Sequence, residues 1–133
     1  MIVIDTSALM AILQNEPEAD DCIAIMDDED QLLISAGTVA EALIVAARRG
    51  LGDVLGSTID QLELDVTPVT VEMARRVAAA YERWGKGVHP AGLNFGDCFA
   101  YALAELNDCP LLYVGEDFAK TDIRSAIAEI TGG

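Results

Sequence analysis

Three carboxylates stand alone in long stretches of the sequence that carry no other charge. They are Asp5 in residues 1–15, Glu41 in residues 32–47 and Asp97 in residues 90–104. A carboxylate buried among apolar side chains loses hydration worth several kcal/mol unless another group replaces the water. Each of these acids therefore requires a hydrogen-bond donor, a counter-ion or a metal ion.

If folding brings the three acids together, only a few cations and reactions suit them. Like charges a few ångströms apart raise each other's pKa, so such a cluster stays ionised at neutral pH only with a cation inside it. Ligand sets made only of oxygen select hard ions, here Mg²⁺ with Mn²⁺ as the alternative. These ions activate water and stabilise charge on phosphorus and on a leaving oxygen. Hydrolysis of phosphodiester bonds is the reaction that this chemistry indicates.

The elements that must position these acids alternate between strand and helix. Apolar runs predict strands at 2–4, 31–35, 64–69 and 111–114, the third of them short or at an edge because it contains Pro68. Helical spacing and capping residues predict a helix that Pro17 opens and helices at 6–13, 37–49, 54–62, 70–84 and 94–107. This alternation indicates an α/β fold with a mainly parallel central sheet, and the length suits one domain spanning residues 1–133.

Four acids fall near the ends of these predicted elements. Asp5 directly follows the first strand, and Asp117 comes three residues after the last one. Glu41 and Asp97 fall in the first turns of two helices. Because ligands of open α/β sheets bind beyond the carboxyl ends of the strands, we expect all four to converge on one edge of the sheet.

Helix capping is the alternative explanation of these acids. Thr38 and Glu41 match a capping box, and Asn94 and Asp97 resemble one. Asp5 would cap the helix that follows it. The chain would then be a non-catalytic acidic α/β module that binds a partner. Against this, serine or asparagine would cap equally well, and capping does not require that the acids be the only charges in long apolar stretches.

The composition restricts the function further. The net charge is −15, from 23 acidic and 8 basic residues, which argues against tight non-specific binding to nucleic acid but not against metal-assisted cleavage of it. The three cysteines have no CxxC spacing and are interpreted as core thiols, and the single histidine, His89, supports neither a zinc site nor a catalytic triad. Without a membrane-spanning run or a signal peptide, we expect a cytoplasmic protein.

Four short motifs lie in order along the sequence. They are DTSAL at 5–9, TVAE at 38–41, LNFGDC at 93–98 and LLYVGEDF at 111–118. Together they resemble the PIN-domain ribonucleases, and within that superfamily the chain is similar to the VapC toxins of type II toxin–antitoxin pairs. The resemblance covers nearly the whole length.

This resemblance implies a PIN-like three-layer sandwich and a magnesium-dependent endoribonuclease that cleaves an RNA substrate. The family's acidic quartet would be Asp5, Glu41, Asp97 and Asp117, with Asp5 and Asp97 as the firmest metal ligands. Ser7 matches a hydroxyl that supports the first acid. The resemblance also implies a homodimer and a cognate VapB-like antitoxin whose tail covers the active site.

Some polar residues remain open to two interpretations. Glu116 stands where many members of the family have Asn, so either Glu116 or Asp117 would face the metal. Asp122 is a further candidate ligand or, equally, a turn residue. The basic residues are left unassigned as RNA contacts, since Arg48 and Arg49 at the end of a predicted helix would stabilise the helix dipole without RNA.

Overall fold

The central element of the fold is a parallel sheet. The computed structural model describes residues 1–127, and within them four strands form one sheet in the order β3-β2-β1-β4. The strands are β1 (Ile2–Ile4), β2 (Leu32–Ser35), β3 (Asp65–Thr67) and β4 (Leu111–Leu112). Val3 is in register with Leu33 on one side and with Leu111 on the other. The third strand lies at an edge, as the nearby Pro68 predicts.

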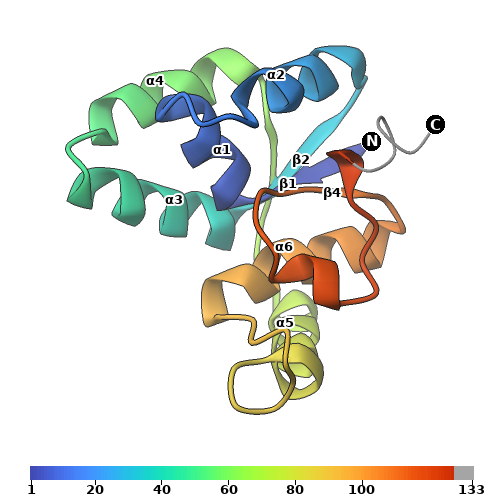
Figure 1. Ribbon diagram of the computed structural model, residues 1–133. Helices are drawn as coiled ribbons and strands as arrows, with labels where there is room; N and C mark the ends of the chain where they lie inside the picture. The colour runs from blue at the N-terminus through green and yellow to red at the C-terminus, as the bar shows by residue number, and fades with distance from the viewer. Residues whose placement is uncertain (128–133) are drawn as a thin grey trace.

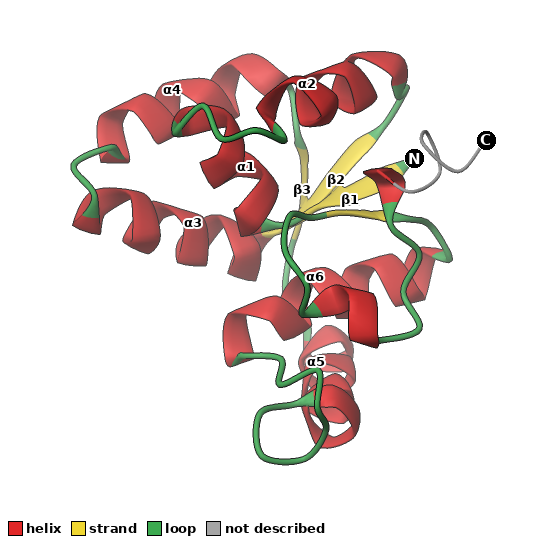
Figure 2. Cartoon of the chain, in the orientation of Figure 1, coloured by secondary structure: helices red, strands yellow, loops and turns green. Residues whose placement is uncertain are grey.

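Helices cover both faces of this sheet. Within residues 1–127 they are α1 (Thr6–Leu13), α2 (Ala19–Asp28), α3 (Ala36–Arg48), α4 (Gly52–Leu62), α5 (Val71–Trp84) and α6 (Phe95–Asn107). Helices α1 to α4 lie on one side of the sheet and α5 and α6 on the other (Figures 1 and 2). The predicted three-layer α/β sandwich is thus confirmed. None of these helices has the length and the apolar composition that a membrane crossing would require.

Each face of the sheet has its own hydrophobic core. Val3 and Leu111 pack with α5 and α6 around Tyr101, whereas Ile4 and Leu112 pack with the helices of the opposite layer. Successive side chains of a strand point to opposite faces, so strands covered on both sides need apolar residues throughout, and β1 and β4 are apolar and buried at every position. The three cysteines are buried free thiols, as the sequence predicts.

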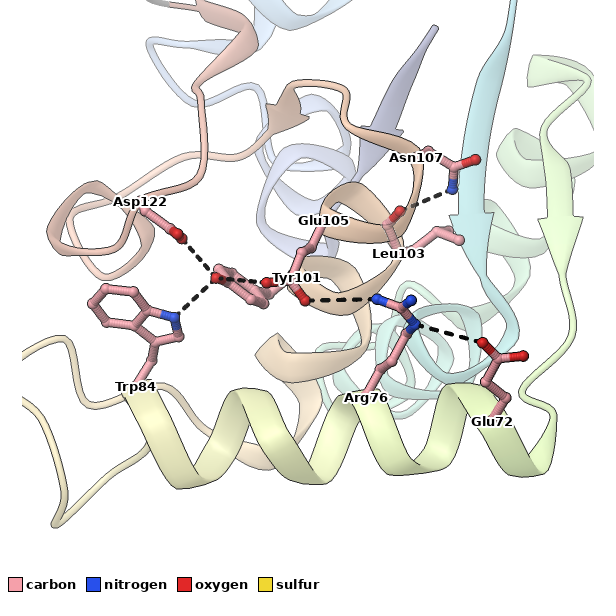
Figure 3. A network of polar contacts seen from close by, with 8 residues as sticks. All are labelled: Glu72, Arg76, Trp84, Tyr101, Leu103, Glu105, Asn107 and Asp122. Carbon is pink, nitrogen blue, oxygen red and sulfur yellow. Dashed lines mark hydrogen bonds and ion pairs between the residues drawn. The ribbon is translucent and has the colours of Figure 1, made fainter.

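A partly buried polar network fixes the segment that follows β4 against α5 and α6 (Figure 3). The indole Nε1 of Trp84 donates a 2.9 Å hydrogen bond to the Tyr101 hydroxyl, which donates a 2.6 Å bond to Asp122 Oδ1. Burial raises the pKa of Tyr101, so its proton stays in place for Asp122. Asp122 also lies 3.6 Å from the Arg83 guanidinium. These contacts give Asp122 a structural role.

Candidate active site

A cleft of about 410 Å³ opens beyond the carboxyl ends of β1 and β4, and all three isolated carboxylates line it. Asp5 comes directly after β1, Glu41 comes from α3 and Asp97 from α6. Val114, two residues beyond β4, lines the cleft as well. Acids separated by more than thirty residues in the chain thus meet at one edge of the sheet, where open α/β folds bind their ligands.

Asp5 is the most buried acid of the cleft, with 2% of its surface exposed. It caps α1, because its Oδ2 accepts hydrogen bonds from the Ser7 backbone amide at 3.0 Å and from the Ser7 hydroxyl at 2.7 Å. The same hydroxyl accepts a 3.0 Å bond from the Val114 amide. Ser7 therefore holds Asp5 and ties the end of β1 to the segment after β4. The second oxygen of Asp5, Oδ1, is buried without a partner among the described residues.

Glu41 is not a capping residue, so the capping alternative fails for it, and the predicted place of Glu41 in the first turn of its helix is also wrong. Ser35 is the N-cap of α3, with its hydroxyl accepting a 3.1 Å bond from the Gly37 amide. Glu41 lies in the second turn of the helix rather than the first, and Thr38 is fully buried within it. The Oε1 atom of Glu41 instead accepts a 2.6 Å hydrogen bond from the Thr6 hydroxyl on α1.

Two glycines allow α3 and α6 to approach closely beside the cleft. A β-carbon at position 96 would lie 1.7 Å from Glu41 Oε2, so the carboxylate reaches over α6 only because residue 96 is glycine. A β-carbon at position 37 would lie 2.4 Å from the Phe99 ring. The pair Gly37 and Gly96 was not singled out from the sequence, although a glycine inside a helix costs stability and usually marks a close contact.

Asp97 and Asp117 differ in their relation to the cleft. Asp97 lies in the first turn of α6, and its Oδ2 accepts a 2.9 Å hydrogen bond from the Asn94 amide, which is the capping contact that the sequence predicts. Asp117 is exposed, precedes a short 3₁₀ turn (Phe118–Lys120) and does not line the cleft. Its charge still contributes to the raised pKa of Asp97. Glu116 is exposed as well.

Burial and the neighbouring negative charges both raise the pKa values of the cleft carboxylates. Burial raises the pKa of Asp5 from 3.8 to about 7, against the lowering effect of its hydrogen bonds from Ser7, and the charges of Asp97 and Glu41 raise it further. Burial likewise raises the pKa of Asp97 to about 6, with smaller contributions from Glu41 and Asp117. A cation among these groups would reverse the shift and keep them ionised at neutral pH.

The donor set fits a hard divalent cation. It consists of carboxylate oxygens, and the buried Oδ1 of Asp5 lacks any donor among the described residues. As the side chains stand, no three acidic, histidine or cysteine residues in the described part of the chain are grouped closely enough to form a complete ligand cluster. Glu41 and Asp97 are instead turned toward Thr6 and the Asn94 amide. Capping thus explains one oxygen each of Asp5 and Asp97, but it explains neither Glu41 nor the unpartnered oxygen of Asp5.

The comparisons with known sequences cover most of the chain. Residues 2–124 match the model of the PIN domain. The chain is 43% identical to VapC ribonuclease Mb0640 of Mycobacterium bovis and to ribonuclease VapC30 of Mycobacterium tuberculosis, over 92% of this chain and 95% of each relative. It is 42% identical to ribonuclease VapC36 of M. tuberculosis, over 92% of this chain and 91% of that protein.

Solved structures show the same fold. VapC20 of M. tuberculosis, described as a sarcin-ricin loop cleaving toxin, superimposes with a TM-score of 0.75 at 14% identity and covers 92% of this chain and 96% of its own. A chain of a toxin–antitoxin complex from Klebsiella pneumoniae gives a TM-score of 0.68 at 20% identity, covering 92% of this chain and 93% of its own. By its sequence and its fold, this chain belongs to the PIN domain family and, within it, to the VapC ribonucleases.

Proposed function

We propose that this protein is an endoribonuclease toxin that hydrolyses RNA phosphodiester bonds in the cleft of Asp5, Glu41 and Asp97, with Mg²⁺ as the resident ion. The observation that carries the proposal is the buried, unpartnered Oδ1 of Asp5, which lies in a cleft with two further carboxylates. An unsatisfied buried carboxylate oxygen is costly to maintain in a purely structural role. Relatives about 43% identical are named ribonucleases, which supports the same reaction.

Asp5 and Asp97 are the residues that would hold the ion. In each, one oxygen is fixed by protein donors, from Ser7 for Asp5 and from the Asn94 amide for Asp97, so the carboxylate plane is oriented before any ligand arrives. A bound Mg²⁺ supplies a water molecule of lowered pKa and positive charge against the scissile phosphate. Mn²⁺ would occupy the same oxygen ligands.

Glu41 is proposed to orient the attacking water. Thr6 fixes its Oε1, which leaves Oε2 above Gly96 to accept a hydrogen bond from the water and to take its proton. Asp117 is proposed as an outer member of the site, acting through its charge on Asp97, because it does not line the cleft. In this hydrolysis the water oxygen would form a bond to phosphorus while the bond from phosphorus to the leaving oxygen breaks, and the leaving oxygen would take up the proton that Glu41 accepted from the water and become a hydroxyl.

The likeness to toxin–antitoxin proteins also supports a proposal about partners. Structural neighbours include a toxin–antitoxin complex from K. pneumoniae and VapBC2 of Rickettsia felis bound to a promoter DNA fragment. We therefore propose a VapB-like antitoxin as the cognate partner, a homodimer as the toxin's own assembly, and action on RNA in the cytoplasm. The PIN domain is proposed to extend over residues 1–133.

The test is RNA cleavage by the purified protein and by two isosteric variants. Total RNA is incubated with the wild-type protein and Mg²⁺, with chelator in a parallel reaction. Asp5→Asn and Asp97→Asn keep the shape of the side chains and remove the charge. Loss of a residue that only supports a metal ligand typically lowers activity roughly 10- to 100-fold. Because Asp5 and Asp97 are proposed as ligands themselves, each variant is expected to lose more activity than that. Cleavage that resists the chelator, or that persists at the wild-type rate in both folded variants, would refute the proposal.

A further inference from the structure

The cleft carries a single positive charge. Among the described residues that line it, Arg49 is the only basic one, while Asp5, Glu16, Glu41 and Asp97 supply negative charge. The chain as a whole has a net charge of −15. RNA that approaches this cleft therefore meets a repulsive field, and Arg49 is the lining side chain that can offset it for a phosphate.

Arg49 is oriented without being neutralised. It is the C-cap residue of α3, and its Nη1 donates a hydrogen bond to Oε1 of Gln14, the C-cap residue of α1. Gln14 is uncharged, so the guanidinium keeps its full charge. Arg49 is exposed, and within residues 1–127 no carboxylate lies within ion-pair distance of it, although Glu16 lines the same cleft.

Other basic residues differ from Arg49 in position or in partner. Arg76 pairs with Glu72 and Glu105, and Arg83 pairs with Asp122. Arg48, the neighbour of Arg49, carries the same charge at the same helix end but does not line the cleft. A general preference for positive charge at the end of α3 would be satisfied by Arg48 alone.

We propose that Arg49 is a substrate-binding residue that holds a phosphate group of the RNA backbone beside the three carboxylates. The inference rests on the proposed ribonuclease function and adds the contact that positions the RNA. A guanidinium with one edge fixed by Gln14 keeps further N–H groups for a phosphate, which it can bind through two parallel hydrogen bonds. The contact is to phosphate, so it strengthens binding without selecting a base.

The test compares Arg49→Gln with Arg48→Gln, which removes the same charge one residue away. RNA affinity is measured by fluorescence anisotropy with a labelled pool of short random-sequence RNA at several salt concentrations, in the Asp97→Asn background to prevent cleavage. Steady-state cleavage of total RNA is measured without that substitution. Arg49→Gln is expected to weaken RNA binding and raise KM about tenfold. It should also make the slope of log affinity against log salt shallower by about 0.7, the value for one phosphate contact on a single strand.

The control variants separate this role from a structural one. Arg48→Gln should leave KM within about twofold of the wild-type value, and Arg49→Lys should keep the salt slope while recovering only part of the affinity. Equal effects of Arg49→Gln and Arg48→Gln, or a loss of kcat with KM and salt slope unchanged, would overturn the assignment. Failure of the wild-type protein to cleave RNA would refute the ribonuclease proposal instead, and the anisotropy measurement would still decide whether Arg49 contacts phosphate.

Discussion

The carboxylate of Glu41 occupies the space that a β-carbon at position 96 would fill, with Oε2 only 1.7 Å from that point. The substitution Gly96→Ala must therefore displace Glu41 from its place between Thr6 and α6. We expect RNA cleavage to fall by about tenfold or more, because the displaced carboxylate no longer orients water. The fold should survive, since alanine favours a helix by about 1 kcal/mol over glycine. Cleavage rate and melting temperature are the two measurements.

Gly56→Ala is the matched control for this variant. Gly56 lies inside α4, and a β-carbon there meets nothing within 4 Å. It should raise the free energy of unfolding by about 0.5–1 kcal/mol and leave cleavage unchanged. If both alanine variants lose activity alike, the loss comes from helix rigidity in general and not from the contact with Glu41.

Thr6 is predicted to be a positioning residue for Glu41. Its hydroxyl donates the 2.6 Å hydrogen bond to Glu41 Oε1. Thr6→Val keeps the shape and removes the donor, and it should lower kcat by roughly 10- to 100-fold, the usual cost of losing a group that orients a site carboxylate. Thr6→Ser keeps the hydroxyl and should retain most activity. Equal rates for the two variants would show that the hydroxyl does not matter.

The stability of the metal-free protein is predicted to depend on pH through Asp5 and Asp97. Their pKa values in the folded protein, about 7 and about 6, lie above the ordinary value of 3.8. Between about pH 4 and about pH 7 the folded state therefore binds more protons than the unfolded state, so the free energy of unfolding falls as the pH rises. Urea denaturation should show this fall, and Asp5→Asn should show less of it. Excess Mg²⁺ should restore stability at neutral pH only in the wild-type protein.

Asp122 is predicted to stabilise the fold rather than to act in catalysis. Tyr101→Phe removes the hydroxyl that links Trp84 to Asp122 and leaves the buried indole N–H without its acceptor. We expect a loss of about 1–3 kcal/mol in the free energy of unfolding, with cleavage retained below the melting temperature. Asp122→Asn keeps an acceptor for the Tyr101 hydroxyl and loses only the charge beside Arg83, so it should lower stability less and retain cleavage. Abolished cleavage in a folded Asp122→Asn protein would return this residue to the list of metal ligands.

The layer order and most helix positions could be predicted from the sequence because the spacing of apolar residues and the capping residues are local signals. Helix α1 has the predicted bounds, and α3 begins one residue early because Ser35 caps it. Helix α4 starts at Gly52 instead of Val54, and β4 keeps only two of four predicted residues. These differences lie at element ends, where local signals are weakest.

The contacts within the cleft could not be predicted, because they join residues far apart in the chain. The isolation of Asp5, Glu41 and Asp97 indicated that they need partners, but nothing local links Thr6 to Glu41 or Gln14 to Arg49. The role of glycine at position 96 depends on how closely two helices cross, which packing decides. Asp117 remains a sequence prediction, since it lies outside the cleft lining.

One divalent ion site is predicted to unite Asp5, which follows β1, with Glu41 of α3 and Asp97 of α6. Its most direct test is Mn²⁺ binding by isothermal titration calorimetry at neutral pH, on the wild-type protein, Asp5→Asn, Asp97→Asn and the control Asp60→Asn, which changes an exposed acid of α4 outside the cleft. The account predicts saturable binding that weakens more than about tenfold in the first two variants and is unchanged in the third. Mn²⁺ affinity that is equal in all four proteins, or absent from the wild type, would contradict it.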